Sequence, residues 1–104
     1  MLSNTLFIEG GTYHVYNRGN GDDPIFRHHG NYEYFMKKYF QYMSAHWDTQ
    51  AWCLMPNHFH LIVTVKPPLP YQDYTQCSQA FANLCNSYAQ SFNRQHKRKG
   101  SLFM

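Results

Sequence analysis

Two histidines, His58 and His60, are the residues whose type and spacing most directly suggest chemistry; they lie in the stretch LMPNHFHLIVTV, residues 54–65. Side chains alternate across a β-strand, so both imidazoles leave the same face, with α-carbons about 6.6 Å apart. Two imidazoles at that separation can converge on one metal ion. Phe59 and Leu61 take the opposite, apolar face. The segment predicts a metal site at one end of a sheet, and two ordinary half-exposed histidines are the alternative interpretation of the spacing alone.

Two other residues could extend this pair. Cys53 precedes it and would supply a zinc-type ligand together with His58 and His60, although no second cysteine lies close by in the sequence. His14 belongs to an earlier predicted strand and would approach the metal if that strand neighbours the histidine strand. A half-buried histidine with satisfied hydrogen bonds is the alternative for His14.

Cations gather near the C-terminal end, in the segment RQHKRKG, residues 94–100. Of the nine lysines and arginines in the chain, four lie here: Arg94, Lys97, Arg98 and Lys99. Such a patch attracts nucleic-acid phosphates through counterion release. The alternative is a solvated helix end whose cations complement the helix dipole. Three residues elsewhere are further predicted DNA contacts, with loop solvation as their alternative: Asn17, Arg18 and Arg27.

The bulk composition sets limits on fold and location. A chain of 104 residues is expected to form one domain, 1–104, and 43% hydrophobic with 18% aromatic residues is ample for a core. Three irregularly spaced cysteines and the absence of a signal-peptide pattern indicate a reducing cytoplasm. No apolar run approaches the roughly 20 residues of a membrane span. The composition therefore predicts neither a membrane protein nor a disordered tail.

Five elements are expected to position these residues. The predicted order is a strand over residues 11–19, a helix from Asn31, a strand over 49–55, a strand over 58–65, and a helix from Asp73 towards Gly100. Pro56-Asn57 links the two middle strands as a hairpin, and the prolines in KPPLP end the second of them. This order indicates an α+β fold in which helices cover an antiparallel sheet.

Both helices are predicted from apolar residues at three- and four-residue steps. Asn31 is the expected N-cap of the first helix, and Gly100 the expected terminator of the second. The apolar stripe of the first helix is Tyr32, Phe35, Met36, Tyr39, Tyr42 and Met43. The stripe of the second is Tyr74, Cys77, Phe81, Leu84, Tyr88 and Phe92.

Several segments together resemble one family. WCLMPNHFHLIV, YHVYNRG, the IF before the first helix and YAQSFNRQHKRKGSLF resemble, in order and spacing, the IS200-like transposases, in particular the branch associated with repetitive extragenic palindromes. The resemblance covers nearly the whole chain. It implies the ferredoxin-like or RRM-like fold of the HUH endonucleases, with an antiparallel sheet and helices packed on it. It also implies a monomer or a homodimer in the cytoplasm of a prokaryote, at the nucleoid when bound to DNA.

The resemblance also implies an activity. Members of this superfamily cut and rejoin single-stranded DNA that bears hairpins or palindromic repeats, through a covalent 5′-phosphotyrosine, with a divalent metal that polarises the phosphate. By position, His58 and His60 would be the metal ligands. Mg²⁺ is expected to suffice in cells, and Mn²⁺ to bind readily because imidazole suits it better.

The expected nucleophile is the point at which this sequence departs from the family. The family tyrosine lies in a later helical segment that has no counterpart here, so the chain is expected to be shortened at its C-terminal end. Tyr88 is a weak candidate nucleophile, because it also falls on the apolar stripe of the second helix and is then a core residue. The prediction is therefore a transposase domain that nicks and rejoins DNA when complete. The alternatives are an inactive remnant that only binds single-stranded nucleic acid, and a zinc-stabilised interaction module.

Overall fold

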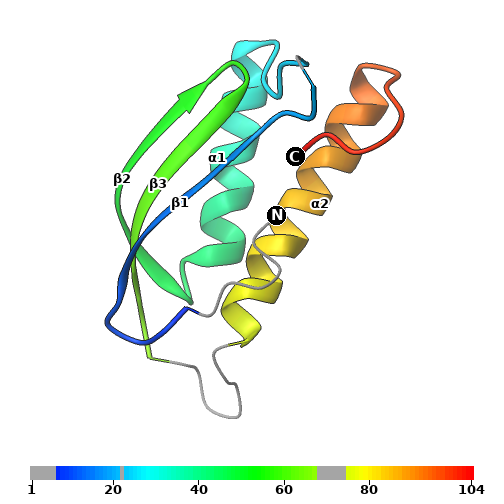
Figure 1. Ribbon diagram of the computed structural model, residues 1–104. Coiled ribbons are helices and arrows are strands. Elements are labelled where there is room, and N and C mark those ends of the chain that lie inside the picture. The colour runs from blue at the N-terminus through cyan, green and yellow to red at the C-terminus, as the bar shows by residue number, and fades with distance from the viewer. Residues whose placement is uncertain (1–6, 22, 68–74) are drawn as a thin grey trace.

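The computed structural model describes residues 7–21, 23–67 and 75–104. Its elements are β1 (Thr12–Arg18), α1 (His29–Met43), β2 (Trp47–Met55), β3 (His58–Val65) and α2 (Thr75–Gln95). The order strand, helix, strand, strand, helix is the predicted one. Both helices lie on the same side of the sheet (Figure 1), which confirms the predicted α+β fold class.

The sheet has the strand order β1-β3-β2, and β3 is antiparallel to both of its neighbours. Met55 pairs with His58, so Pro56 and Asn57 form the predicted two-residue link of the hairpin. The register shifts between Thr49 and Ala51, which leaves Gln50 as an extra residue in β2 and produces a β-bulge. The histidine strand is therefore the central strand, held by a ladder on each side.

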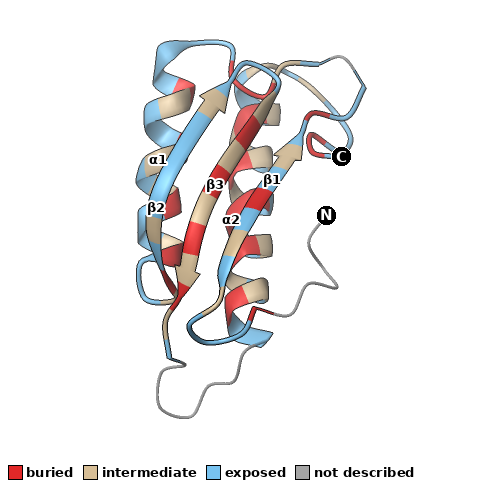
Figure 2. Cartoon of the chain, turned by 60° about the vertical axis from the view of Figure 1, so that its left-hand side comes forward, coloured by how far each residue is buried: buried red, intermediate tan, exposed pale blue. Residues whose placement is uncertain are grey.

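Burial alternates strictly along β3, as Figure 2 shows by colour. The four buried residues face the helices: Phe59, Leu61, Val63 and Val65. The four half-buried residues face away from the helices: His58, His60, Ile62 and Thr64. We call the first side of the sheet the covered face and the second side the open face. Figure 2 views the open face, with both helices behind the strands.

The core fills the space between the covered face and the two helices. From α1 it receives Phe35, Tyr39 and Met43, and from α2 it receives Cys77, Phe81, Leu84, Cys85, Tyr88 and Phe92. The predicted stripes are thus confirmed for the described residues. Trp47 donates its indole N–H to the Tyr39 hydroxyl over 2.7 Å, so the polar atoms of these two large rings are paired inside the core.

The helix boundaries differ from the predictions in informative ways. Helix α1 begins at His29, so the expectation that Asn31 is its N-cap is wrong. Asn31 lies inside the first turn, where its Oδ1 accepts hydrogen bonds from the backbone N–H groups of Arg27 (2.8 Å) and His28 (3.0 Å). The side chain ties the incoming loop to the helix from within its first turn. Sequence spacing alone does not distinguish this from an N-cap.

The end of α2 also comes earlier than predicted. The helix ends at Gln95, and Lys97 adopts a positive φ of 52°, which lets the Arg98 N–H return to the Asn93 carbonyl. A left-handed residue just after a helix commonly closes it in this way. Gly100, with φ of 85°, turns the chain again further on. The expected start of this helix at Asp73 lies outside the described residues.

Strand β2 begins two residues before the predicted position, because buried Trp47 pairs with Val65. Within the described parts of the chain, no helix is long and apolar enough to cross a membrane.

Candidate metal and nucleic-acid site

The open face places side chains from all three strands in rows, because residues paired across an antiparallel sheet share a face. One row reads Arg18, His58 and Met55, and the next reads Tyr16, His60 and Cys53. Both rows lie at the end of the sheet that carries the turn between β2 and β3. The histidine pair is thus bordered by β1 on one side and by β2 on the other.

His58 and His60 lie as the alternation predicts, with ring centroids 5.0 Å apart and the rings nearly perpendicular. Each ring engages one nitrogen within the protein. Nδ1 of His58 is 2.7 Å from Asn57 Oδ1, and Nδ1 of His60 is 2.8 Å from Nε2 of His14. Neither Nε2 makes a hydrogen bond to a described residue. Ligating histidines commonly have their second nitrogen engaged in this manner, which fixes the ring orientation.

His14 therefore does approach the pair, as expected if its strand neighbours the histidine strand. Its ring stacks on His60 at 5.0 Å between centroids. Partial desolvation, followed by the proximity of His14 and His58, lowers the pKa of His60. A lowered pKa keeps the imidazole neutral at neutral pH, which is the form that binds metal.

A pocket of about 630 Å³ opens over this site. Its lining residues are Tyr16, Asn17, Arg18, Asn57, His58, His60 and Met104. No aspartate or glutamate is among these described lining residues. The carbonyl oxygens of its two side-chain amides are already engaged, Asn17 Oδ1 with the Arg18 N–H (2.8 Å) and Asn57 Oδ1 with His58. The amide NH₂ groups remain as donors, and one Nη of the exposed Arg18 guanidinium contacts the Met104 sulfur over 4.0 Å. Amide and guanidinium donors suit phosphate or other oxygen acceptors.

The donor set fits a metal ion in part. Two neutral imidazoles suit Mn²⁺ or Zn²⁺ better than Mg²⁺. Across the described ranges, no group of three or more His, Cys, Asp or Glu side chains lies close enough together to hold an ion. Cys53 pairs with His60 across the strands but completes no such group, so the zinc-module interpretation gains no support. Any further ligands would be water, phosphate oxygens or groups outside the described residues.

Tyr88 does not reach this pocket. It is 1% exposed in the core behind the covered face, and its hydroxyl donates to the Ile25 carbonyl. Burial raises the pKa of Tyr88 well above its usual value, with Tyr32 adding to the effect. A neutral phenol on the far side of the sheet cannot reach a ligand bound over His58 and His60 on the open face. The structure supports the core interpretation of Tyr88.

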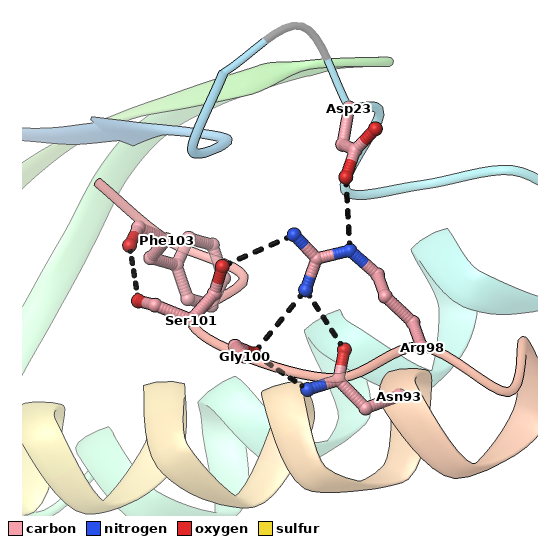
Figure 3. Close-up of polar contacts among 6 residues, drawn as sticks. All are labelled: Asp23, Asn93, Arg98, Gly100, Ser101 and Phe103. Atoms are coloured by element: carbon pink, nitrogen blue, oxygen red, sulfur yellow. Dashed lines mark hydrogen bonds and ion pairs between the residues drawn. The ribbon is translucent and has the colours of Figure 1, made fainter.

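Arg98 has a structural role in the loop that follows α2 (Figure 3). Its guanidinium forms an ion pair with Asp23 at 3.0 Å and donates to Asn93 Oδ1 and to the carbonyls of Gly100 and Ser101. Only 13% of the side chain is exposed. We expected Arg98 to contact DNA, but the structure commits its donors to holding this loop against the segment after β1.

The other cations of the C-terminal segment, Arg94, Lys97 and Lys99, are exposed. Arg27 is also exposed, and its guanidinium lies 5.4 Å from the centre of the Phe92 ring. Backbone hydrogen bonds join the segment between β1 and α1 to the histidine hairpin. The Gly19 N–H donates to the Asn57 carbonyl, and the Ile25 N–H donates to the Pro56 carbonyl. The end of β1, the hairpin turn, the start of α1 and the end of α2 gather at the upper end of the molecule in Figure 1.

Sequence reasoning missed three residues of the pocket: Tyr16, Asn57 and Met104. Tyr16 carried a usable signal, because it lies two residues after His14 and so shares the open face. Asn57 was considered only as a turn residue. Met104 reaches the pocket because its N–H donates to the Arg18 carbonyl and Phe103 pairs with Gly19, a long-range pairing that no local pattern reveals.

The comparison of sequences finds no match for the chain, either among protein-family models or among curated proteins. The comparison of structures finds a REP-associated tyrosine transposase bound to a REP hairpin, with a TM-score of 0.61 and 15% identity. The match covers 97% of this chain and 55% of that protein, so the chain spans about half of its length. The likeness shows that the two proteins share a fold.

Proposed function

We propose that this domain binds hairpin-bearing single-stranded DNA on the open face of its sheet. In the context of a complete enzyme it would serve the cutting and rejoining of that DNA. The observation that carries the proposal is the pocket around His58 and His60, where two imidazoles with uncommitted Nε2 atoms lie beside Arg18 and amide donors. The fold shared with a protein that binds a REP hairpin supports the same choice of ligand.

In this proposal His58 and His60 hold a divalent ion, Mn²⁺ or Mg²⁺, through their Nε2 atoms. The ion would supply Lewis-acid polarisation of a phosphodiester. Asn57 and His14 orient the two imidazoles through their Nδ1 atoms. Arg18, which is exposed at the edge of the pocket, would pair with a phosphate. Binding, orientation and charge complementarity are the parts of the reaction that these residues provide.

A second candidate function is binding without cleavage, and the position of Tyr88 favours it for these 104 residues. The only tyrosine that the sequence offered as a nucleophile is buried behind the sheet. We therefore expect incubation with Mn²⁺ and a hairpin oligonucleotide to yield no covalent adduct that depends on Tyr88. An adduct on denaturing gels that Tyr88→Phe abolishes would return this residue to the catalytic role.

The exposed cations would follow the phosphate backbone around the pocket: Arg18, Arg27, Arg94, Lys97 and Lys99. Asn17 would contribute its amide NH₂ group. We place the protein in the cytoplasm, at the nucleoid when it is bound to DNA, as a monomer or a homodimer.

Fluorescence anisotropy with a labelled hairpin oligonucleotide that carries single-stranded flanks tests the binding proposal. We expect tighter binding to this probe than to a blunt duplex of the same length, and a logarithm of affinity that falls linearly with the logarithm of salt concentration. Absence of salt-dependent binding to either probe would overturn the proposal.

Calorimetry with Mn²⁺ tests the metal pair without relying on activity. We expect the wild-type protein to bind Mn²⁺, and the double variant His58→Ala, His60→Ala to lose the binding heat. Ile62→Ala is the matched control, because Ile62 lies on the same face of β3 as the two histidines and its side chain carries no metal-binding atom. Equal Mn²⁺ binding by wild type and double variant would remove the site.

A further inference from the structure

Three aromatic rings stand close together on the open face, beside the histidine pair. His14 and Tyr16 leave β1 on the same side, with ring centroids 4.7 Å apart, and Tyr16 lies 6.0 Å from the ring of His60. The angles between the three ring planes lie between 19° and 32°. The rings are therefore nearly parallel, and together they form an aromatic platform that consists of His14, Tyr16 and His60.

Tyr16 is an exposed part of this platform. Its exposed fraction is 59%, the highest among the large hydrophobic side chains that the structure describes as exposed. Tyr13, one position before His14, differs from Tyr16, because its side chain is partly buried and packs against the core. Packing of the fold therefore does not account for the position of the Tyr16 ring.

The surroundings of Tyr16 select the kind of ligand. The pocket lined by Tyr16 also contains Arg18 and the amides of Asn17 and Asn57, whose NH₂ groups remain as donors, and no aspartate or glutamate is among its described lining residues. A flat ring beside cationic and amide donors matches a nucleotide, in which a planar base and an anionic phosphate occur together. Bases stack on aromatic side chains whatever their sequence, because every base has a π-face.

We infer that Tyr16, supported by His14, is a stacking site for one unpaired base of the bound strand, next to the phosphate held near His58 and His60. The inference rests on the proposed function and adds to it a specific subsite. It also supplies a preference, since a base within a duplex is already stacked and cannot lie on the ring. The platform therefore favours single-stranded flanks and unpaired hairpin nucleotides over continuous duplex.

The test uses hairpin oligonucleotides with 2-aminopurine at successive unpaired positions, in EDTA so that no metal bridges protein and DNA. We expect binding of the wild-type protein to quench the fluorescence at one position. Tyr16→Leu should lose this quenching and bind roughly tenfold more weakly. Tyr16→Phe keeps the ring and removes only the hydroxyl, so it should retain both the quenching and the affinity.

An abasic nucleotide at the quenched position provides the matched control on the DNA. If the ring stacks on that base, wild type and Tyr16→Leu should bind the abasic probe with affinities equal within about twofold. Circular dichroism of Tyr16→Leu should be unchanged, because the side chain is exposed.

The possible failures are distinguishable. Salt-dependent hairpin binding that Tyr16→Leu leaves intact, in affinity and in quenching, would overturn the stacking site and leave the proposed function in place. Loss of affinity in Tyr16→Phe as well would assign the effect to the hydroxyl and would also overturn the stacking site. Absence of hairpin binding by the wild-type protein would overturn the site and the proposed function together.

Discussion

The two faces of β3 use one stretch of eight residues for two different purposes. The covered face buries Phe59, Leu61, Val63 and Val65 against the helices. The open face presents His58, His60, Ile62 and Thr64 to the opposite side. The two imidazoles lie at the turn end of the open face, while the covered face of β3 is apolar along its full length. A strand with a two-residue period can thus hold a site rigidly, because every second side chain anchors it in the core.

The difference between the faces also explains why the site is more rigid than a loop would be. His58 and His60 flank Phe59, which is fully buried and packs against the rings of Phe35 and Phe103. The backbone that carries both imidazoles is therefore held by core packing and by a hydrogen-bonded ladder on each side. Substitutions on the two faces should separate stability from binding.

The largest difference between an effect on stability and an effect on metal binding is expected for the neighbouring substitutions Phe59→Ala and His60→Ala. Truncating the buried ring should lower the free energy of unfolding by about 3–5 kcal/mol, because it removes apolar burial and leaves a cavity. Removing the half-buried imidazole of His60 should change stability by only about 0.5 kcal/mol but should abolish Mn²⁺ binding. Urea denaturation and calorimetry measure the two quantities.

Leu61→Ala and Ile62→Ala repeat the comparison one step along the strand. Leu61→Ala should be clearly destabilising, because Leu61 is buried, and Ile62→Ala should be much less so, because Ile62 is half-buried. Neither residue belongs to the histidine pair. Similar losses of stability at residues 59 and 60 would contradict the division of β3 into two faces.

A smaller difference between stability and DNA binding is expected among the cations of the C-terminal segment, which are neighbours in the sequence. Arg98→Ala should lower the free energy of unfolding by about 1–2 kcal/mol, because it leaves carbonyl and amide oxygens of the loop without their donor. Lys97→Gln with Lys99→Gln should leave stability nearly unchanged but reduce the slope of log affinity against log salt by roughly two, one for each lost phosphate contact. Thermal melting and hairpin titrations at several salt concentrations measure these effects.

Arg98→Lys is the matched control for the loop, since it keeps the charge and loses the planar set of donors. It should recover little of the lost stability. A double Lys variant with an unchanged salt dependence would show that the C-terminal cations do not follow the phosphate backbone.

The sequence predicted the fold class and the histidine pair because both rest on local periodicity. Alternating apolar residues define β3, three- and four-residue steps define the helices, and His58 and His60 share a face by the same alternation. The two-residue link of Pro56 and Asn57 followed from the position of the two strand patterns. These features need no knowledge of which distant segments meet.

The features that could not be predicted depend on contacts between distant parts of the chain. Arg98 reads as one of four similar cations, and its role depends on Asp23, which lies 75 positions earlier. Asn31 reads as an N-cap, yet its Nδ2 group also donates to Gln95 on α2. His14 was expected near the histidine pair only on the condition that β1 neighbours β3, and the sequence left that pairing open. Tertiary pairing supplies these roles, and single-residue patterns do not encode them.

The smallest predicted effect concerns His96, a histidine on the covered side of the molecule. Its ring packs on Phe92 at 4.3 Å between centroids and on His28 at 5.4 Å, and its Nε2 is buried without a hydrogen-bond partner among the described residues. Desolvation, followed by the nearby Arg27 and His28, lowers the pKa of His96 below its usual 6.5. The unfolded chain therefore binds more protons than the folded chain as the pH falls through and below that value.

Stability should consequently decrease as the pH falls from about 7.5 to 5. His96→Gln should make the dependence of Tm on pH shallower, while a residual slope remains from His46 and His60, whose pKa values are also lowered by desolvation. Melting curves are recorded in EDTA, so that no metal on the open face contributes. An equally steep loss of Tm in His96→Gln would show that protonation of this ring carries no penalty.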